Sequence, residues 1–320
     1  AVFLMLRTLT AGKEVIVSRG ELVEIGGSFR IPDIMRESGA ILVEVGTTNR
    51  TRLSDYEQAI NENTAAILKV HPSNYVIEGF TESVEISKLV KLAKARGLYC
   101  LHDWGSGTFY QFEQKALQNY PTVQQEIQKR ADIICFSADK LLGAVQGGII
   151  LGSKAAIEKM RKHPLYRVLR ADKVTLGLLE SVLEACFEPE SLKEKVTSIR
   201  LLERTPEEIR AQATQMLDKF FPESDSGWSV RIEETDSRTG GGALPELPLP
   251  SSAMVISHPR YKAQEIQNWL RSQSIPVIVR VQTESVWFDF RTVFEEDEKV
   301  LSETLRLMLK SSILEQAEET

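Results

Sequence analysis

The chain has 320 residues, a formal net charge of −6, and ordinary proportions of apolar residues (42%) and charged residues (26%). This length allows one large or two medium domains with a sizeable core. The acidic balance argues against an electrostatic grip on nucleic acid over the whole surface, although it allows a local basic patch. No run of about 18 apolar residues occurs, so the sequence predicts no membrane-spanning helix.

Three further features restrict the class of protein: the cysteines, the histidines and the amino terminus. The three cysteines, Cys100, Cys135 and Cys186, lack metal-type spacing, and two of them lie in apolar runs. This pattern favours reduced, buried thiols in a cytoplasmic protein over a disulfide framework. The four histidines are also scattered without ligand spacing, so no metal site is expected. Residues 1–9 are typical of the middle of an amphipathic helix and lack an initiator Met, and we therefore expect the chain to be a piece of a longer protein.

Residues 1–175 predict a large α/β domain. Short apolar runs alternate there with amphipathic segments, which is typical of βαβ units and a mostly parallel sheet with helices on both faces. Pro32 near a first turn, a capping-box pattern at 54–57 and Arg96-Gly97 mark predicted helix boundaries. The predicted strands are 15–17, 41–45, 65–70, 98–102, 133–136 and 148–151, and the predicted helices begin near Pro32 or span 54–60, 84–95, 124–130 and 154–162.

Residues 176–320 predict linking helices and a smaller carboxyl-terminal α+β domain. Long helical patterns cover 174–187 and 206–220, with Pro189 and Pro222 as breaks. The predicted strands that follow are 230–232, 253–257, 277–281 and 285–290, and the predicted helices are 263–273 and 296–309. The glycine-rich stretch 240–248 is either a flexible connection or a loop that folds over a site between the domains. The acidic tail 315–319 is expected to fray.

The stretch 133–143 is the strongest candidate for chemistry. Its apolar run predicts a buried strand that leads directly to Lys140, and open α/β sheets bind ligands beyond the carboxyl ends of their strands. A desolvated lysine is the residue type for a Schiff base with pyridoxal phosphate, and Gly143, Gly147 and Gly148 allow close approach of the backbone. The alternative is a solvated lysine at a helix amino terminus.

Polar residues end two neighbouring predicted strands as well. If the sheet is parallel, His71 to Asn74, Asp103, and Ser137 to Lys140 converge on one crevice. Asp103 would then be the anion at the pyridine nitrogen, Ser137 a phosphate ligand, and Asn74 a hydrogen-bond donor to the ring's 3-oxygen. The alternatives are that Asp103 caps a loop and that His71 is a loop histidine instead of a ring contact.

Two arginines follow the proposed Schiff-base lysine. Arg167 and Arg170 are three residues apart, so they share a face if this segment is helical, where they could clamp an anion. The alternative is an ordinary solvated face. Competing sequence motifs are absent: no G-x-G-x-x-G fingerprint, P-loop, H-E-x-x-H or G-x-S-x-G occurs.

Five ordered motifs carry a resemblance to a known family. They are 17–32 (VSRGELVEIGGSFRIP), 45–49 (VGTTN), 136–143 (FSADKLLG), 240–247 (GGGALPEL) and 291–294 (RTVF). Together they resemble bacterial L-seryl-tRNA(Sec) selenium transferases over nearly the whole chain. The resemblance implies a fold-type-I pyridoxal phosphate enzyme that converts Ser-tRNA(Sec) to selenocysteinyl-tRNA(Sec) with selenophosphate, as a ring-shaped homo-oligomer in the cytoplasm.

The same resemblance implies roles for several residues, and it shows where this chain differs from the family. It implies that Lys140 bears the Schiff base and that Arg167 and Arg170 line an anion site; Arg19, in the first motif, is also expected to bind substrate. The family usually has glycine in place of Ala138, and Gly-Pro-Gln-Ala-Gly in place of residues 144–148. It also has a longer amino-terminal part, with a tRNA-binding domain and the turn that binds the cofactor phosphate. Two alternatives stay open: a pyridoxal phosphate lyase for a small amino acid or amino sugar, and a catalytically silent fragment or assembly subunit.

Overall fold

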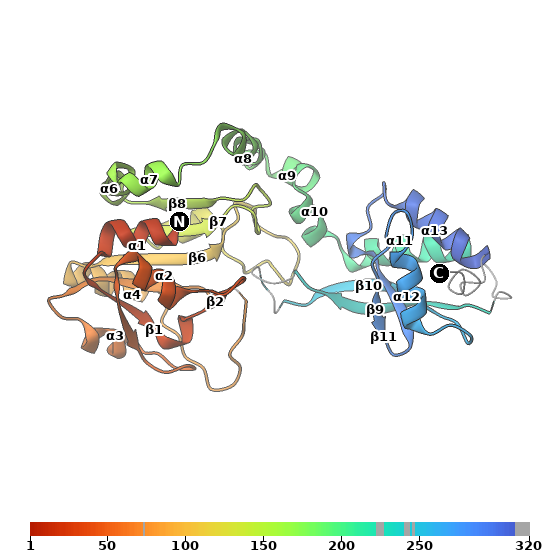
Figure 1. Cartoon of the computed structure of the whole chain (residues 1–320), viewed down its shortest axis with the longest axis horizontal. Helices are drawn as coiled ribbons and strands as arrows, with labels where there is room; N and C mark the ends of the chain where they lie inside the picture. Colours follow the sequence, from red (N-terminus) through yellow and green to blue (C-terminus); the bar gives the residue numbers. More distant parts are fainter. Residues whose placement is uncertain (73, 222–226, 240–243, 245–246, 311–320) are drawn as a thin grey trace. The chain divides into compact units, whose positions relative to one another are not determined.

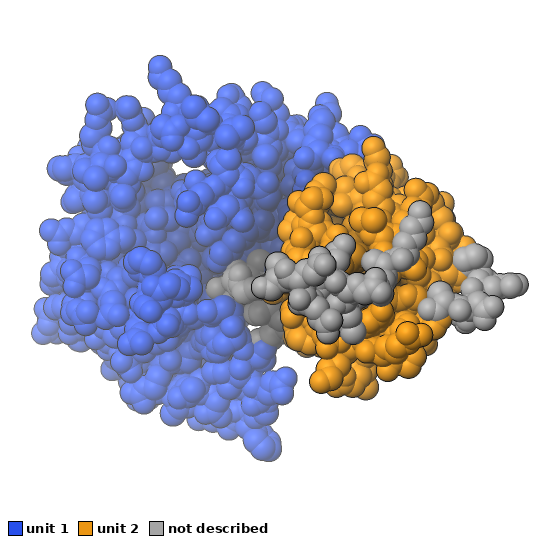
Figure 2. Space-filling view, turned by 45° about the vertical axis from the view of Figure 1, so that its right-hand side comes forward, with its two compact units in different colours: residues 1–200, 239–247 blue, residues 201–238, 248–320 orange. Residues whose placement is uncertain are grey.

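The computed structural model describes residues 1–72, 74–221, 227–239, 244 and 247–310. They form two compact units (Figure 2): unit 1 comprises Ala1–Arg200 and Thr239–Leu247, and unit 2 comprises Leu201–Arg238 and Pro248–Thr320. The first change of unit therefore comes later than residue 175, where the sequence led us to expect a domain boundary. None of the helices in the described residues combines the length and apolar character needed to cross a membrane.

Unit 1 contains the sheet that organises the candidate site. Its described strands are, in spatial order, β4 (Ile41–Val45), β1 (Glu14–Ser18), β5 (Thr64–Val70), β6 (Tyr99–Ser106), β7 (Ile133–Ser137) and β8 (Gly148–Gly152) (Figure 1). The strands from β4 to β7 pair in parallel, and only β8 at the edge of this described sheet is antiparallel to its neighbour. The mostly parallel α/β sheet predicted from the sequence is thus confirmed.

Helices cover both faces of this sheet. Successive strand residues point to opposite faces, so apolar side chains of one strand pack against helices on each side. On one face, Val15 and Val17 pack in a core cluster with residues of α1 (Val2–Thr10), α2 (Ile31–Ser38) and α6 (Lys154–Lys162). On the other face, Ile16 packs with residues of α3 (Leu53–Ala59) and α4 (Ile86–Arg96).

A third cluster extends the core along β6, β7 and β8. Trp104 and Phe136 pack there with residues of α5 (Val123–Gln128) and α8 (Lys173–Ala185). The packing of α8 against this cluster keeps it within unit 1. The remaining short elements of the unit are η1 (Arg19–Glu21), β2 (Glu24–Ile25), β3 (Phe29–Arg30), α7 (Pro164–Val168), α9 (Pro189–Lys195) and α10 (Thr197–Glu203), the last of which continues into unit 2.

Unit 2 is an antiparallel sheet with helices, in agreement with the predicted α+β composition. Its described strands are ordered β11 (Arg280–Gln282), β12 (Ser285–Asp289), β10 (Leu249–Ser257) and β9 (Ser229–Ser237). The core cluster includes Trp228, Met254 and Phe288, packed with residues of α11 (Pro206–Phe220), α12 (Ala263–Arg271) and α13 (Glu298–Lys310). A short 3-10 helix, η2 (Phe290–Thr292), follows β12.

Some predicted details are wrong. The helix predicted to begin at Ser54 from a capping-box pattern at 54–57 begins one residue earlier, at Leu53. The N-cap is Arg52, whose backbone N–H donates a hydrogen bond to the carboxylate of Asp55. Strand β11 begins at Arg280, so the predicted strand 277–281 is mostly outside it. Most of the glycine-rich loop 240–248 and the acidic tail 315–319 lie outside the described residues.

Candidate active site

The carboxyl ends of β5, β6 and β7 lie side by side. In the parallel ladders, Asp103 of β6 is opposite Val70 of β5 and Cys135 of β7. The backbone N–H of His71 then donates to the carbonyl oxygen of Asp103 at 2.9 Å. The expectation that these segments lie on neighbouring parallel strands is therefore confirmed, and their convergence on one crevice remains a prediction.

Asp103 is a buried carboxyl group within a strand. It is only 8% exposed, and β6 continues past it to Ser106, so both the predicted strand end at 102 and the loop-capping interpretation are wrong. The continuation depends on a bulge between Asp103 and Gly105, where Gly105 has a φ of 74° that favours glycine. Burial raises the pKa of Asp103 and prevails over the lowering by the charge of Lys140, the thiol of Cys135, the charge of the amino terminus and the backbone amide of Gly105.

Lys140 is half-buried in a tight turn between β7 and β8. Its carbonyl oxygen accepts from the N–H of Gly143 at 2.9 Å, and the N–H of Leu141 donates to the buried Ser106 hydroxyl at 3.3 Å. The strand is followed by this turn and by β8, so the alternative of a helix amino terminus is wrong. The turn therefore holds the lysine at the end of β7, next to β6.

Ala138, at the position where the resemblance implies a glycine, fits this turn. Its backbone N–H donates to the carbonyl oxygen of Gly147 at 2.8 Å, and its own carbonyl oxygen accepts from Ala144 at 2.9 Å. Its φ is not positive, and its fully buried side chain belongs to the cluster of Phe136 and Leu142. The methyl group is thus accommodated without backbone strain.

His71 completes the set of groups beside Asp103. Burial lowers its pKa, and the charges of Lys69 and Lys140 lower it further, so the imidazole is neutral at physiological pH. Its Nδ1 is buried and has no hydrogen-bond partner among the described residues. A buried polar atom of this kind is expected to find a partner in a bound molecule or in water. Lys140 is thus close enough to influence the charge of both His71 and Asp103.

The surroundings of the other predicted cofactor and substrate contacts, Ser137, Asn74 and Arg19, do not indicate a role. Ser137 is half-buried at the end of β7, opposite Ser106. Asn74 donates through Nδ2 to the carbonyl oxygen of Glu24 at 2.7 Å, and the exposed Arg19 pairs with Glu44 at 3.0 Å. Their assignments to the cofactor phosphate, the ring oxygen and the substrate remain predictions.

The predicted shared helix face of Arg167 and Arg170 is wrong. Helix α7 ends at Val168, and Leu169 caps it, so Arg170 lies outside the helix. A five-residue helix started by Pro164 is too short to carry both side chains. Both arginines are exposed, and neither forms an ion pair with the described residues. Their role at an anion site remains a prediction.

Sequence reasoning missed a buried ion pair beside the site. Glu21 accepts from Lys69 Nζ at 2.5 Å and from the backbone N–H of Val70 at 3.0 Å, and both side chains are largely buried. The available signal was a single charged residue, Lys69, within the apolar run of β5. Lys69, Glu21 and His71 line a cavity of about 760 Å³ in unit 1.

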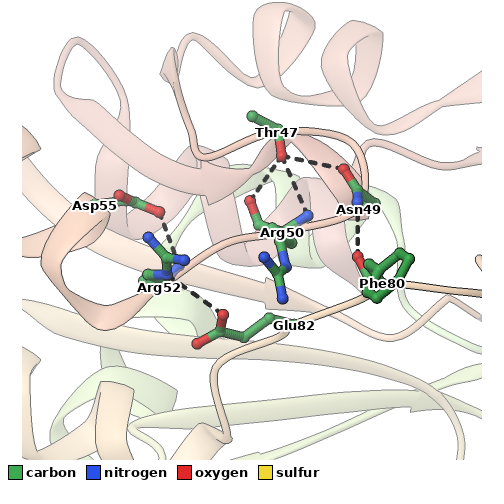
Figure 3. A network of polar contacts seen from close by, with 7 residues as sticks. All are labelled: Thr47, Asn49, Arg50, Arg52, Asp55, Phe80 and Glu82. Atoms are coloured by element: carbon green, nitrogen blue, oxygen red, sulfur yellow. Dashed lines mark hydrogen bonds and ion pairs between the residues drawn. The ribbon is translucent and has the colours of Figure 1, made fainter.

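Thr48 and Asn49 of the VGTTN motif line this cavity, and Figure 3 shows the polar contacts around the motif. Thr47 Oγ1 donates to the carbonyl oxygen of Arg50 at 3.0 Å, Asn49 donates to that of Phe80 at 2.7 Å, and Arg52 pairs with Glu82 at 3.3 Å. The guanidinium of Arg50 takes no part in these contacts (Figure 3), and Arg50 lines the cavity. At Gly46, where φ is 71°, an added Cβ would lie 2.3 Å from Thr51 Oγ1, which explains the glycine.

The residues present fit the ring side of pyridoxal phosphate. That cofactor needs a lysine amine, a carboxylate for its pyridinium nitrogen and a largely dry site. Lys140, in the turn after the neighbouring strand, and the buried Asp103 that senses its charge supply these groups. His71 Nδ1, which has no partner among the described residues, lies beside them.

Comparison with known proteins agrees with this geometry. The family model for L-seryl-tRNA selenium transferases matches residues 1–294. The L-seryl-tRNA(Sec) selenium transferase of Aquifex aeolicus (strain VF5) is 46% identical over 310 residues, which cover 97% of this chain and 68% of the relative. That of Pasteurella multocida (strain Pm70) is 46% identical over 298 residues, with 93% and 65% coverage. The chain spans about two thirds of the length of these relatives.

A solved structure shares the fold. The structure of D-glucosaminate-6-phosphate ammonia-lyase matches with a TM-score of 0.62 at 20% identity, and the match covers 97% of this chain and 78% of that chain. At this identity the match shows the fold alone. The expected fold class, that of fold-type-I transferases, is confirmed. Because the family match extends over most of the chain, this protein belongs to the L-seryl-tRNA selenium transferase family.

Proposed function

We propose that this chain carries the catalytic part of a pyridoxal phosphate enzyme that converts Ser-tRNA(Sec) to selenocysteinyl-tRNA(Sec) with selenophosphate. The observation that carries the proposal is a buried carboxyl group, Asp103 in β6, that senses the charge of Lys140 in the turn after the adjacent parallel strand β7. The relatives named for this activity are longer than the chain. The proposed activity is therefore that of the whole protein.

The roles of the residues follow from their placement. Pyridoxal phosphate, when bound, supplies a ring that accepts the electron pair left at the seryl Cα when its proton is removed. Asp103 would hold the proton on the ring nitrogen, because its carboxylate is buried and solvent screens its attraction for a positive charge only weakly. Lys140 Nζ removes the Cα proton and returns it after selenium has replaced the β-hydroxyl.

Arginines are proposed to hold the anionic substrates. Arg167 and Arg170 are exposed and have no ion-pair partner among the described residues, so their guanidinium groups are available to selenophosphate. Arg19 pairs with Glu44 and would have to exchange that carboxylate for a phosphate oxygen.

We also propose that the protein works as a ring-shaped homo-oligomer in the cytoplasm. The segment around α7 and α8 exposes several large apolar side chains, and exposed apolar patches mark interaction surfaces. They are Tyr166, Val168, Leu169, Val174, Leu176, Leu178 and Phe187. The three free cysteines are consistent with a reducing compartment.

The test uses the full-length protein with added pyridoxal phosphate. Borohydride reduction is expected to fix a pyridoxyl group on Lys140, identified by peptide mass spectrometry, and Lys140→Ala is expected to lose both this label and selenocysteinyl-tRNA(Sec) formation. Lys154→Ala, which changes an exposed lysine of α6, is the matched control. A label on another lysine in the wild-type protein would overturn the assignment, and turnover of free serine without Ser-tRNA(Sec) would favour a lyase.

A further inference from the structure

Cys135 contacts Asp103 directly. The two residues are opposite one another in the β6–β7 ladder, so their side chains leave the sheet on the same face. The Sγ of Cys135 lies 3.7 Å from Asp103 Oδ1, within the range of a thiol hydrogen bond. Both residues are buried.

The thiol is the donor in this contact. Burial raises the pKa of Cys135 well above its ordinary value, and the charge of Asp103 raises it further. Cys135 therefore keeps its proton at physiological pH and directs it at the carboxylate. Neither Cys100 nor Cys186 donates its thiol to a carboxylate: the thiol of Cys186 donates to the carbonyl oxygen of Val182, and Cys100 faces the opposite side of the sheet.

This donor becomes more important once the cofactor is in place. Four groups favour the ionised form of Asp103: the charge of Lys140, the thiol of Cys135, the charge of the amino group of Ala1 and the backbone amide of Gly105. In the proposed function the amine of Lys140 would be bonded to the cofactor and would no longer be a free ammonium group. The thiol and the amide of Gly105 then remain as the protein's own stationary donors to the carboxylate.

We infer that Cys135 is a positioning residue for the cofactor: its thiol occupies Asp103 Oδ1, which orients the carboxylate so that Oδ2 is left for the protonated ring nitrogen. The inference rests on the proposed function and deepens it. It differs from a packing role, because a packing role would affect any ligand of the same shape, whereas this role concerns only a ligand with a basic ring nitrogen.

The experiment compares two ligands in four full-length proteins. The proteins are wild type, Cys135→Ala, Cys135→Ser and Cys100→Ala, and the ligands are pyridoxal phosphate and 1-deazapyridoxal phosphate, which lacks the ring nitrogen. Cys100 is the matched control, because it is an equally buried strand cysteine that does not contact Asp103. Affinity is measured by absorbance titration.

Cys135→Ala is expected to bind pyridoxal phosphate about five-fold more weakly than wild type, the effect of losing one modest hydrogen bond. Its affinity for the deaza analogue is expected to be unchanged, and Cys135→Ser is expected to restore wild-type affinity because a hydroxyl also donates. In ¹⁵N NMR of labelled cofactor, the ring nitrogen of Cys135→Ala is expected to be less protonated.

Two results would overturn the inference while leaving the proposed function intact. One is equal weakening of both ligands in Cys135→Ala, which indicates packing alone. The other is identical behaviour of Cys135→Ala and Cys100→Ala. If wild type forms no bond between Lys140 and pyridoxal phosphate, the proposed function itself fails, and the inference fails with it.

Discussion

Lys69 Nζ lies 2.5 Å from Glu21 Oε1, and the two side chains are only 15% and 7% exposed. This pair connects η1 to β5, next to His71 and the candidate site. Glu21→Ala would leave a largely buried ammonium group without its partner, and we expect it to lower the free energy of unfolding by about 3–5 kcal/mol. Urea unfolding followed by circular dichroism measures the change.

The control for this pair is an exposed one. Asp33→Ala breaks the contact with Arg36, whose side chain is 70% exposed, and should cost less than about 1 kcal/mol. The double variant Glu21→Ala/Lys69→Met removes both charges and should recover most of the loss. Equal costs for Glu21→Ala and Asp33→Ala would contradict the prediction.

Arg291 begins the RTVF motif and has a structural role in unit 2. Its Nη1 donates to the carbonyl oxygens of Leu201 at 2.8 Å and Arg204 at 3.1 Å, and its Nη2 donates to that of Pro250 at 2.5 Å. Lysine cannot reproduce this fork of donors. We expect Arg291→Lys to destabilise the protein by about 2 kcal/mol. Thermal unfolding measures the change in stability. The control is Arg271→Lys, at an exposed position of α12, which should change stability by less than about 0.5 kcal/mol.

The elements predicted best are those whose signals are local. Helix α11 has the predicted bounds because Thr205 and Glu208 form a capping box just before and within its first turn. Helix α6 begins where Ser153 accepts a hydrogen bond from the N–H of Ala156. In the site, the apolar strand before Lys140 and the carboxyl group of Asp103 were recognisable for the same reason, since each lies in or directly after a continuous apolar run.

Features that depend on contacts distant in sequence were not predictable. The continuation of β6 beyond Asp103 includes Gly105, a weak strand former, and is stabilised by pairing with β7 across a bulge. The burial of Glu21 follows from its pairing with Lys69, far along the chain. The short length of α7 separates Arg167 from Arg170, although their spacing matches a helix turn.

Replacing Ala138 tests whether its methyl group stabilises or strains the turn between β7 and β8. Ala138→Gly restores the residue usual in the resembling family, but it removes a fully buried methyl group and adds backbone freedom in the unfolded chain. We expect a loss of about 1 kcal/mol in urea unfolding and no change in pyridoxal phosphate affinity. A gain in stability would show that the alanine strains the turn. Ala155→Gly, at an exposed position in α6, measures the backbone contribution alone.

His102 should make the stability of unit 1 depend on pH. The imidazole is 5% exposed in β6, and burial, followed by the charge of Lys69, lowers its pKa from 6.5 to about 3. Glu126 Oε2 lies 3.6 Å from His102 Nδ1, and a free carboxylate there would favour the charged imidazole. Its charge is already neutralised by Lys129, whose Nζ lies 2.5 Å from Glu126 Oε1, so the effect of burial prevails.

The sign of the effect follows from proton binding. Between pH 6.5 and about 3 the unfolded chain has a protonated His102 and the folded chain does not, so the unfolded state binds more protons and stability falls as the pH is lowered. His102→Gln is expected to flatten this part of the stability curve, measured by urea unfolding at a series of pH values. His258→Gln, at a half-exposed position in unit 2, should alter the slope far less. An unchanged slope in His102→Gln would mean that the imidazole gains a proton in the folded protein as readily as in the unfolded chain.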